Sequence, residues 1–252
     1  MLTAANLPSI IAHRGNAAEF PENTLKGLES AVGLGVRHVE FDVQLTADRV
    51  PVLFHDADLA RVAGRPDCVH DLTWSELSEI RVGEVERLGN AHAFTYPPSL
   101  AQTVDAIAAW DGVTAFVEVK RASMRRFGRE IVLRRIAEVL RPVLDRCVLI
   151  SFDLPSVQIL RIMTGARIGW VLSKFDVAAQ QQAAELAPQF LFANVERLPA
   201  EPEPLWAGPW DWALYEVRDL QTAQACQQRG AKFVETMAVR NLQHAFAEAR
   251  RQ

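Results

Sequence analysis

The chain has 252 residues, of which 49% are hydrophobic and 23% are charged, and its formal net charge is −4 at pH 7. This composition is typical of a globular protein with a large core, and it argues against nucleic-acid binding, which requires a basic face. Because no linker-like composition divides the sequence, we expect a single domain over residues 1–252.

The cysteines and the N-terminal segment bear on the cellular compartment. Cys68, Cys147 and Cys226 are widely spaced and match neither a zinc-ligand pattern nor a disulfide framework, which favours a reducing compartment. Residues 1–8 contain neither a basic segment nor a long apolar run, and no stretch reaches membrane-spanning length. We therefore expect a cytoplasmic protein without stable membrane insertion, whose oligomeric state the sequence leaves open.

The first predicted elements are a strand and a helix. Large apolar and β-branched residues dominate Ser9–Ala12, which predicts a strand, and His13 and Arg14 follow at its end. The run Pro21-Glu22-Asn23-Thr24 then begins a helix that continues to about Gly33. Either the Asn or the Thr of this run is expected to cap that helix.

A β-hairpin is predicted next. The apolar runs 38–45 and 50–55 are separated by a segment too short for a crossover helix, so they can only be joined as antiparallel arms. Folding the chain about this turn brings His55 back opposite Glu40 and Asp42.

Glu40 and Asp42 lie two positions apart, so their side chains leave the strand on the same face. Two carboxylates on one face repel each other unless a cation lies between them. A divalent cation bound by oxygen ligands is the simplest resolution.

Residues 57–98 lack strand character and contain one predicted helix, Thr73–Ile80, which begins with a capping box from Thr73 to Glu76. So long an interruption between regular elements indicates an inserted lid or small subdomain.

From Ser99 onward, helices and short apolar strands alternate. The predicted helices are 99–110, 124–140, 156–163, 177–187, 220–229 and 239–250, and the predicted strands are 115–120, 147–152, 168–172, 190–194, 212–217 and 233–235. With residues 50–55 treated as a hairpin arm, eight strands each precede a helix, which predicts a (β/α)8 TIM barrel with a small insertion after its second strand. An open doubly wound sheet is the alternative, but the first strand is not followed by the Gly-rich turn typical of that fold.

Polar residues gather at the strand ends, where barrel enzymes carry their chemistry. Glu118 on the third barrel strand joins Glu40 and Asp42 as a candidate metal ligand, and three oxygen ligands favour Mg²⁺ or Ca²⁺ over zinc. Arg14 and Lys120 are candidate phosphate-binding residues beside them.

His13 and His55 are the groups expected to exchange protons at this site near neutral pH. A single histidine at a strand end is more often structural, but two that converge on three carboxylates favour catalysis. Ser151 follows an apolar strand without the turn of a serine nucleophile, so we expect a minor role at most.

These residues also carry a resemblance to a family. The motifs, in chain order, are Ile-Ala-His-Arg-Gly, Pro-Glu-Asn-Thr, Glu-x-Asp, Thr-x-Asp, Val-x-Phe-His-Asp, Pro-Ser-Leu, Val-Glu-Val-Lys and Ser-Phe-Asp, between Ile10 and Asp153. Together they resemble the glycerophosphodiester phosphodiesterase family. The resemblance implies a (β/α)8 barrel, a divalent metal, and hydrolysis of glycerophosphodiesters such as glycerophosphocholine and glycerophosphoethanolamine to glycerol 3-phosphate and an alcohol, through a cyclic phosphate. It assigns acid and base roles to His13 and His55, metal ligation to Glu40, Asp42 and Glu118, and phosphate contacts to Arg14 and Lys120.

The C-terminal third departs from the pattern of that family. Tyr215-Glu216-Val217-Arg218 stands where Trp-Thr-Val-Asn is usual, and Glu235-Thr236 stands where Thr-Asp is usual. Tyr215 still offers an aromatic face to a substrate pocket. Because the predicted metal ligands and both histidines match the family pattern, the departures concern substrate choice more than the reaction.

Other functions remain open at this point. The same barrel type can act on a lysophospholipid or phosphoinositol head group, and an apolar rim at the entrance would favour such lipids. The loop that contains Trp206, Trp210 and Trp212 could form this rim, or it could pack over the barrel. A non-catalytic glycerophosphate-binding protein is a further alternative, against which the pair of histidines argues.

Overall fold

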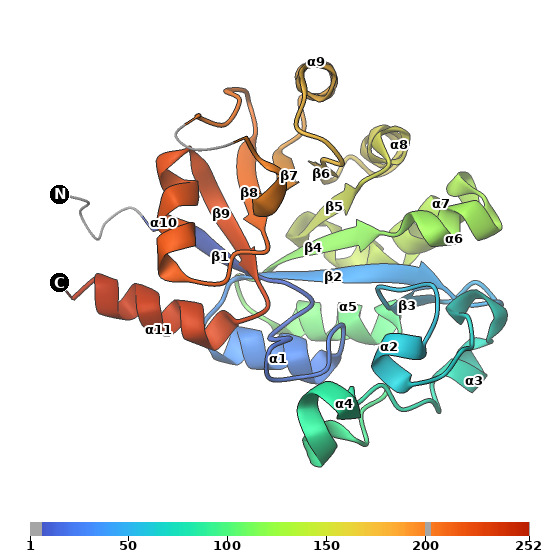
Figure 1. The fold of residues 1–252 in the computed structure, drawn as a ribbon. Coiled ribbons are helices and arrows are strands. Elements are labelled where there is room, and N and C mark those ends of the chain that lie inside the picture. The colour runs from blue at the N-terminus through green and yellow to red at the C-terminus, as the bar shows by residue number, and fades with distance from the viewer. Residues whose placement is uncertain (1–6, 200–202, 252) are drawn as a thin grey trace.

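The computed structural model describes residues 7–199 and 203–251, and its strands form one closed sheet (Figure 1). The barrel strands are β1 (Ser9–Ala12), β2 (His38–Leu45), β4 (Thr114–Val119), β5 (Cys147–Ser151), β6 (Arg167–Val171), β7 (Phe190–Asn194), β8 (Asp211–Tyr215) and β9 (Ala231–Thr236). Each pairs in parallel with its neighbours, and β1 pairs with both β9 and β2, which closes the barrel. The predicted (β/α)8 fold is confirmed.

The hairpin after the second strand is present. Strand β3 (Pro51–Leu53) runs antiparallel to β2, with Val43 opposite Leu53, and the turn between them contains Arg49 at φ 62°. The backbone N–H of Phe54 donates to the carbonyl of Asp42 (3.0 Å), so the next residue, His55, returns to the end of β2 as predicted.

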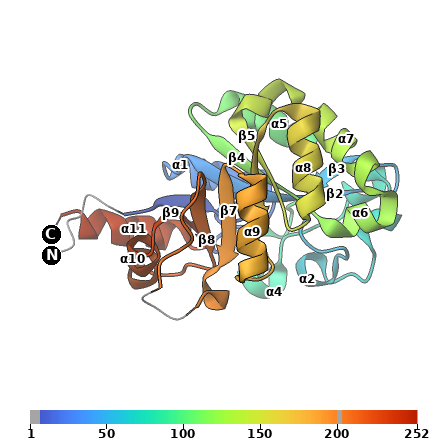
Figure 2. The ribbon, with the colours of Figure 1, turned by 90° about the horizontal axis from the view of Figure 1, so that it is seen from above.

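Helices cover the outside of the barrel (Figures 1 and 2). They are α1 (Leu25–Gly33), α5 (Leu100–Ala109), α6 (Arg121–Phe127), α7 (Arg129–Leu140), α8 (Leu154–Thr164), α9 (Val177–Leu186), α10 (Leu220–Gln228) and α11 (Val239–Ala249). A large apolar core fills the space between helices and strands, and a smaller cluster that includes Phe116, Ile150 and Phe192 fills the barrel interior. The interior is therefore a packed core that leaves the strand ends to carry the chemistry.

Two predicted helices are wrong in their extent. The helix predicted over Thr73–Ile80 is a single turn, Trp74–Leu77. The residues predicted as a single helix, 124–140, belong to two helices, α6 and α7, which meet at Gly128. Gly128 has φ 87° and ψ 138°, a conformation that a residue with a Cβ adopts only under strain, so the glycine breaks the helix despite the helical spacing around it.

The segment between β3 and α5 contains three one-turn α-helices, α2 (Ala60–Ala63), α3 (Trp74–Leu77) and α4 (Val85–Leu88), on the side of the β2–β3 hairpin (Figure 1). It also contains two 3-10 helices, Val69–Asp71 and Gly89–His92. Its apolar cluster includes Phe54, Leu59 and Leu77. The capping box of α3 is formed as predicted, with Thr73 and Glu76 bonding reciprocally. A lid function for residues 57–98 stays a prediction.

The loop before β8 packs on the barrel. Residues 200–202 lie outside the described residues, but Trp206 stacks on Phe175 with ring centroids 4.0 Å apart and accepts a hydrogen bond at its carbonyl from Trp212 Nε1 (2.9 Å). Trp210 is also buried. Trp210 and Trp212 therefore belong to the core and the half-buried Trp206 packs against it, so the expectation of an apolar rim is wrong. No helix in the described parts of the chain is long and apolar enough to cross a membrane.

We predict that Gly128→Ala destabilises the protein by about 1–2 kcal/mol, because the added Cβ is strained at this φ although the described surroundings leave room for it. Urea unfolding followed by circular dichroism measures the change. Gly33→Ala is the matched control, since Gly33 also faces open space but has no positive φ, and it should be neutral or stabilising. Equal effects of the two substitutions would contradict the strain at Gly128.

Candidate active site

A pocket of about 110 Å³ opens at the C-terminal ends of the barrel strands. Its polar lining residues are His13, Arg14, His55, Glu118, Lys120, Tyr215, Glu216 and Glu235, and its apolar ones are Ile150, Phe152, Val171 and Phe192. Residues far apart in the sequence, from β1 to β9, thus meet at one point because every barrel strand points the same way.

Glu40, Asp42 and Glu118 form an acidic cluster, in which one oxygen from each carboxylate lies within 4.8 Å of the others. The register explains it: Asp42 lies directly opposite Glu118 on the neighbouring strand, and Glu40 precedes Asp42 on the same face. All three side chains are almost fully buried. The structure therefore brings together the three carboxylates that the sequence predicted as candidate metal ligands.

The acidic cluster fits a hard cation. Glu40 Oε1 is buried and has no hydrogen-bond partner among the described residues, although Glu40 Oε2 accepts from the backbone N–H of Arg14 (3.0 Å). Burial raises the pKa of Glu40 well above its ordinary value, and the nearby charges of Asp42, Glu235 and Glu118 add to this. A bound cation would supply the missing partner and relieve the repulsion.

Arg14 and Lys120 contact the carboxylates of this cluster. Arg14 Nε lies 3.1 Å from Asp42 Oδ2, and Lys120 Nζ lies 3.1 Å from Asp42 Oδ1 and 2.8 Å from Glu118 Oε1. Burial alone would raise the pKa of Asp42, but the charges of Lys120 and Arg14 outweigh it and hold that pKa well below its ordinary value. Asp42 is thus ionised, and both cations are fixed at the pocket wall.

The glycine after Arg14 allows this loop its tight course. Gly15 has φ 83°, and a Cβ at this position would lie 2.6 Å from the carbonyl carbon of Gly27 in α1. The neighbouring Asn16 N–H donates to the Gly27 carbonyl (2.9 Å). The close approach of two backbones explains why a glycine follows His13 and Arg14.

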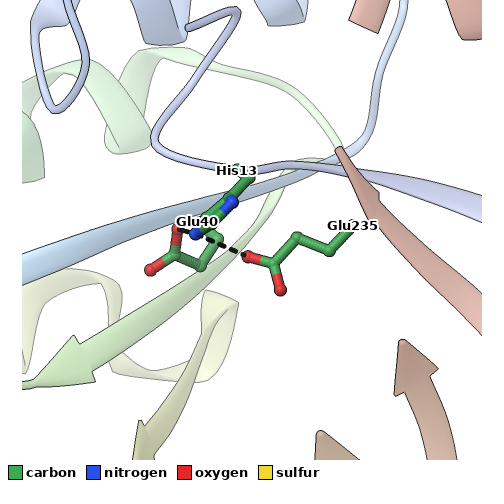
Figure 3. A group of neighbouring side chains, drawn as sticks. All are labelled: His13, Glu40 and Glu235. Carbon is green, nitrogen blue, oxygen red and sulfur yellow. Dashed lines mark ion pairs between the residues drawn. The ribbon is translucent and has the colours of Figure 1, made fainter. Parts of the chain in front are cut away.

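His13 lies between two carboxylates (Figure 3). Its Nε2 is 4.0 Å from Glu40 Oε2 and 4.0 Å from Glu235 Oε1. Burial, followed by the charge of Arg14, lowers the pKa of His13 to about 3, so its imidazole is neutral at neutral pH.

His55 is the more accessible histidine and lines the same pocket. Its Nδ1 lies 2.7 Å from Asp56 Oδ1, and the carbonyl of His55 accepts a hydrogen bond from Gln44 Nε2 (3.0 Å). The two predicted catalytic histidines therefore reach one pocket from the ends of β1 and β3.

Tyr215 ends β8 and also lines the pocket. Burial raises the pKa of its phenol to about 12, so Tyr215 presents an aromatic face and a neutral hydroxyl. Ser151, by contrast, donates to the carbonyl of Val119 (2.9 Å) and accepts from the Asp153 N–H (3.1 Å), which are structural contacts.

Two residues of the Pro-Glu-Asn-Thr run, Glu22 and Asn23, contact site residues, although the sequence pattern predicted only a helix cap here. Thr24 caps α1, whereas Asn23 donates from Nδ2 to Asp42 Oδ2 and accepts at Oδ1 from the Asp42 N–H, both at 2.9 Å. Glu22 Oε1 accepts from Arg14 Nη1 (3.1 Å). Asn23 has φ 54°, a conformation that Asn tolerates better than most residues, which explains why an asparagine suits this position.

Glu235 on β9 was noted in the sequence only as a departure from a family pattern. It is buried beside His13. Burial is the main cause that raises its pKa to about 8, and the negative charges of Glu118 and Asp42 raise it further. Its position near the C-terminal end of a barrel strand could have indicated from the sequence that Glu235 belongs to the site.

The fold and these side chains define a (β/α)8 barrel with an acidic, phosphate-compatible site at the strand ends. The chain belongs to the glycerophosphoryl diester phosphodiesterase family, whose model matches residues 13–203.

Three similar proteins illustrate the relationship. Glycerophosphodiester phosphodiesterase 1 of Bos taurus is 35% identical over 112 residues, which are 44% of this chain and 34% of the relative, so the match spans about a third of that protein. A phosphodiesterase of Oleispira antarctica, solved in complex with the product sn-glycerol-3-phosphate, superposes with a TM-score of 0.81 and 23% identity over 98% of this chain and 100% of that one. A glycerophosphodiester phosphodiesterase of Parabacteroides distasonis gives a TM-score of 0.78 and 19% identity over 97% and 98% of the two chains. The solved structures share the fold.

We predict that Asn23→Ala destabilises the protein by about 1–3 kcal/mol, because it leaves the buried Asp42 N–H unpaired and removes a donor to its carboxylate. Urea unfolding measures the loss, and Asn90→Ala, at an exposed position, is the control and should be close to neutral. An Asn23 variant as stable as the control would show that Asp42 does not depend on this amide.

Proposed function

We propose that this protein hydrolyses glycerophosphodiesters, such as glycerophosphocholine and glycerophosphoethanolamine, to glycerol 3-phosphate and an alcohol, with Mg²⁺ or Ca²⁺ as cofactor. The observation that carries the proposal is one pocket lined by two histidines, two cationic side chains and Glu118, the carboxylate through which the buried acidic cluster of Glu40, Asp42 and Glu118 reaches that pocket. Membership of the family and the product bound to the Oleispira antarctica relative support the substrate class.

Glu40, Asp42 and Glu118 are the residues that would hold the cation. The support is their mutual proximity and Oε1 of Glu40, which has no hydrogen-bond partner in the part of the chain that the structure describes. Once bound, a divalent cation supplies positive charge that polarises the phosphate and lowers the pKa of the adjacent glycerol hydroxyl.

Arg14 and Lys120 bind the phosphate in this proposal. A guanidinium offers forked donors that match phosphate oxygens, and an ammonium adds a point charge. Their side chains line the pocket, and their ion pairs with Asp42 hold them in place before substrate arrives. Such preorganised charge stabilises the negative charge that develops in the transition state.

His13 and His55 move the protons. One imidazole takes the proton of the glycerol hydroxyl next to the ester, and that oxygen attacks phosphorus. The P–O bond to the alcohol breaks as the other imidazole donates a proton to the leaving oxygen. Water then opens the cyclic phosphate to glycerol 3-phosphate, so the overall reaction consumes a single water molecule.

Tyr215 is proposed to contact the bound substrate from the wall formed by β8. Its aromatic ring lines the pocket together with Phe152 and Phe192, and these apolar faces suit the carbon atoms of glycerol or of the leaving alcohol.

We predict that the protein releases glycerol 3-phosphate from glycerophosphocholine or glycerophosphoethanolamine when Mg²⁺ or Ca²⁺ is added, and that a chelator abolishes release.

His13→Ala and His55→Ala should each lower turnover by about a hundredfold or more, because each removes a proton-transfer group. An enzyme-coupled assay for glycerol 3-phosphate measures both effects.

His244→Ala is the matched control, because His244 is an exposed histidine on α11 and should be dispensable. A folded wild-type protein that releases no glycerol 3-phosphate with either metal would contradict the proposed substrate class. Full activity of His55→Ala would remove that residue from the scheme.

A further inference from the structure

Arg61 on α2 binds two carboxylates that belong to different loops. Its Nη1 and Nη2 donate to Glu22 Oε2 and Oε1, each at 2.7 Å, and its Nε donates to Asp56 Oδ2 at 2.7 Å. The guanidinium thus makes a bidentate contact with the Glu22 carboxylate and one hydrogen bond to the Asp56 carboxylate at the same time.

Each of these carboxylates in turn contacts a residue of the proposed machinery. Glu22 Oε1 also accepts from Arg14 Nη1 (3.1 Å), and Asp56 Oδ1 lies 2.7 Å from His55 Nδ1. Through its two partners, Arg61 connects the loop after β1 to the loop after β3. The segment between β3 and α5 thereby reaches both a phosphate-binding residue and a proton-transfer residue.

The contact to Asp56 also bears on the proton of the His55 ring. A carboxylate acceptor at Nδ1 places the ring proton on that nitrogen and leaves Nε2 as the nitrogen available for proton transfer. Arg61 holds the second oxygen of the same carboxylate, so it fixes the orientation from which Asp56 accepts.

We propose that Arg61 is a positioning residue that sets the geometry of His55 and Arg14 relative to each other. This inference rests on the proposed function, because it gives Arg61 a catalytic consequence only through those two residues. A lysine at this position keeps the charge, but its single ammonium cannot reproduce the bidentate contact to Glu22 together with the bond to Asp56.

The test compares Arg61→Lys with Arg65→Lys. Arg65 is a matched control because it lies on the same segment, has similar exposure, and is paired with Asp67 at the same 2.7 Å, away from the pocket. We expect Arg61→Lys to lower kcat/KM for a glycerophosphodiester by about tenfold to a hundredfold, mostly through kcat, since small displacements of reacting groups are costly. Arg65→Lys should match the wild type.

A double-mutant comparison of Arg61 and Asp56 distinguishes a positioning role of Arg61 from a general structural role. If Arg61 acts through Asp56, then Arg61→Lys combined with Asp56→Asn should lose less activity than the product of the two single losses. Thermal unfolding of every variant shows whether it is folded at the assay temperature. Activity of Arg61→Lys equal to that of Arg65→Lys, a loss accounted for by unfolding, or multiplying losses would each overturn the proposal.

A second readout does not depend on turnover. Nitrogen-15 NMR of the histidine rings, with His55 assigned by His55→Ala, should show the proton of His55 on Nδ1 in the wild type and a mixed tautomer in Arg61→Lys. An unchanged His55 signal in Arg61→Lys would overturn the positioning role. A wild type without glycerol 3-phosphate release but with this NMR change would refute the proposed substrate and leave the positioning of His55 supported.

Discussion

The ion pairs and hydrogen bonds around Asp42 are the constraint on which the site depends. A buried carboxylate is costly unless it is paired, and Asp42 is paired with Arg14 and Lys120 and accepts from the Asn23 amide. Its own backbone N–H is bound by the same amide. The strand end of β2, the loop after β1 and the end of β4 are therefore locked to one another through a single side chain.

The barrel makes this arrangement possible. Parallel strands in register place Asp42 opposite Glu118, and the closure of β1 onto β9 adds His13 and Glu235 from opposite ends of the chain. Burial and the crowding of carboxylates raise the pKa values of Glu40 and Glu235, and a divalent cation bound among these oxygens would relieve that repulsion.

The sequence predicted those features that depend on local pattern. Same-face spacing predicted Glu40 with Asp42, the short turn predicted the return of His55, and the alternation of strands and helices predicted the barrel, now confirmed by the closed strand order. It did not predict the contacts of Asn23, Glu22 or Arg61, because these pair side chains across loops whose paths only the folded chain defines. The break at Gly128 was missed because helical spacing continues on both sides of it, and only the backbone conformation reveals it.

The proposed chemistry depends on the acidic cluster, so the most direct measurement is calorimetric titration of Mg²⁺ and Ca²⁺ into chelator-treated protein. We expect a single cation to bind per chain, with binding weakened by about tenfold or more in Glu118→Gln, where a ligand oxygen is lost, and unchanged in Glu79→Gln, which lies at an exposed position. Absence of cation binding to the folded wild type, or equal binding by both variants, would contradict it.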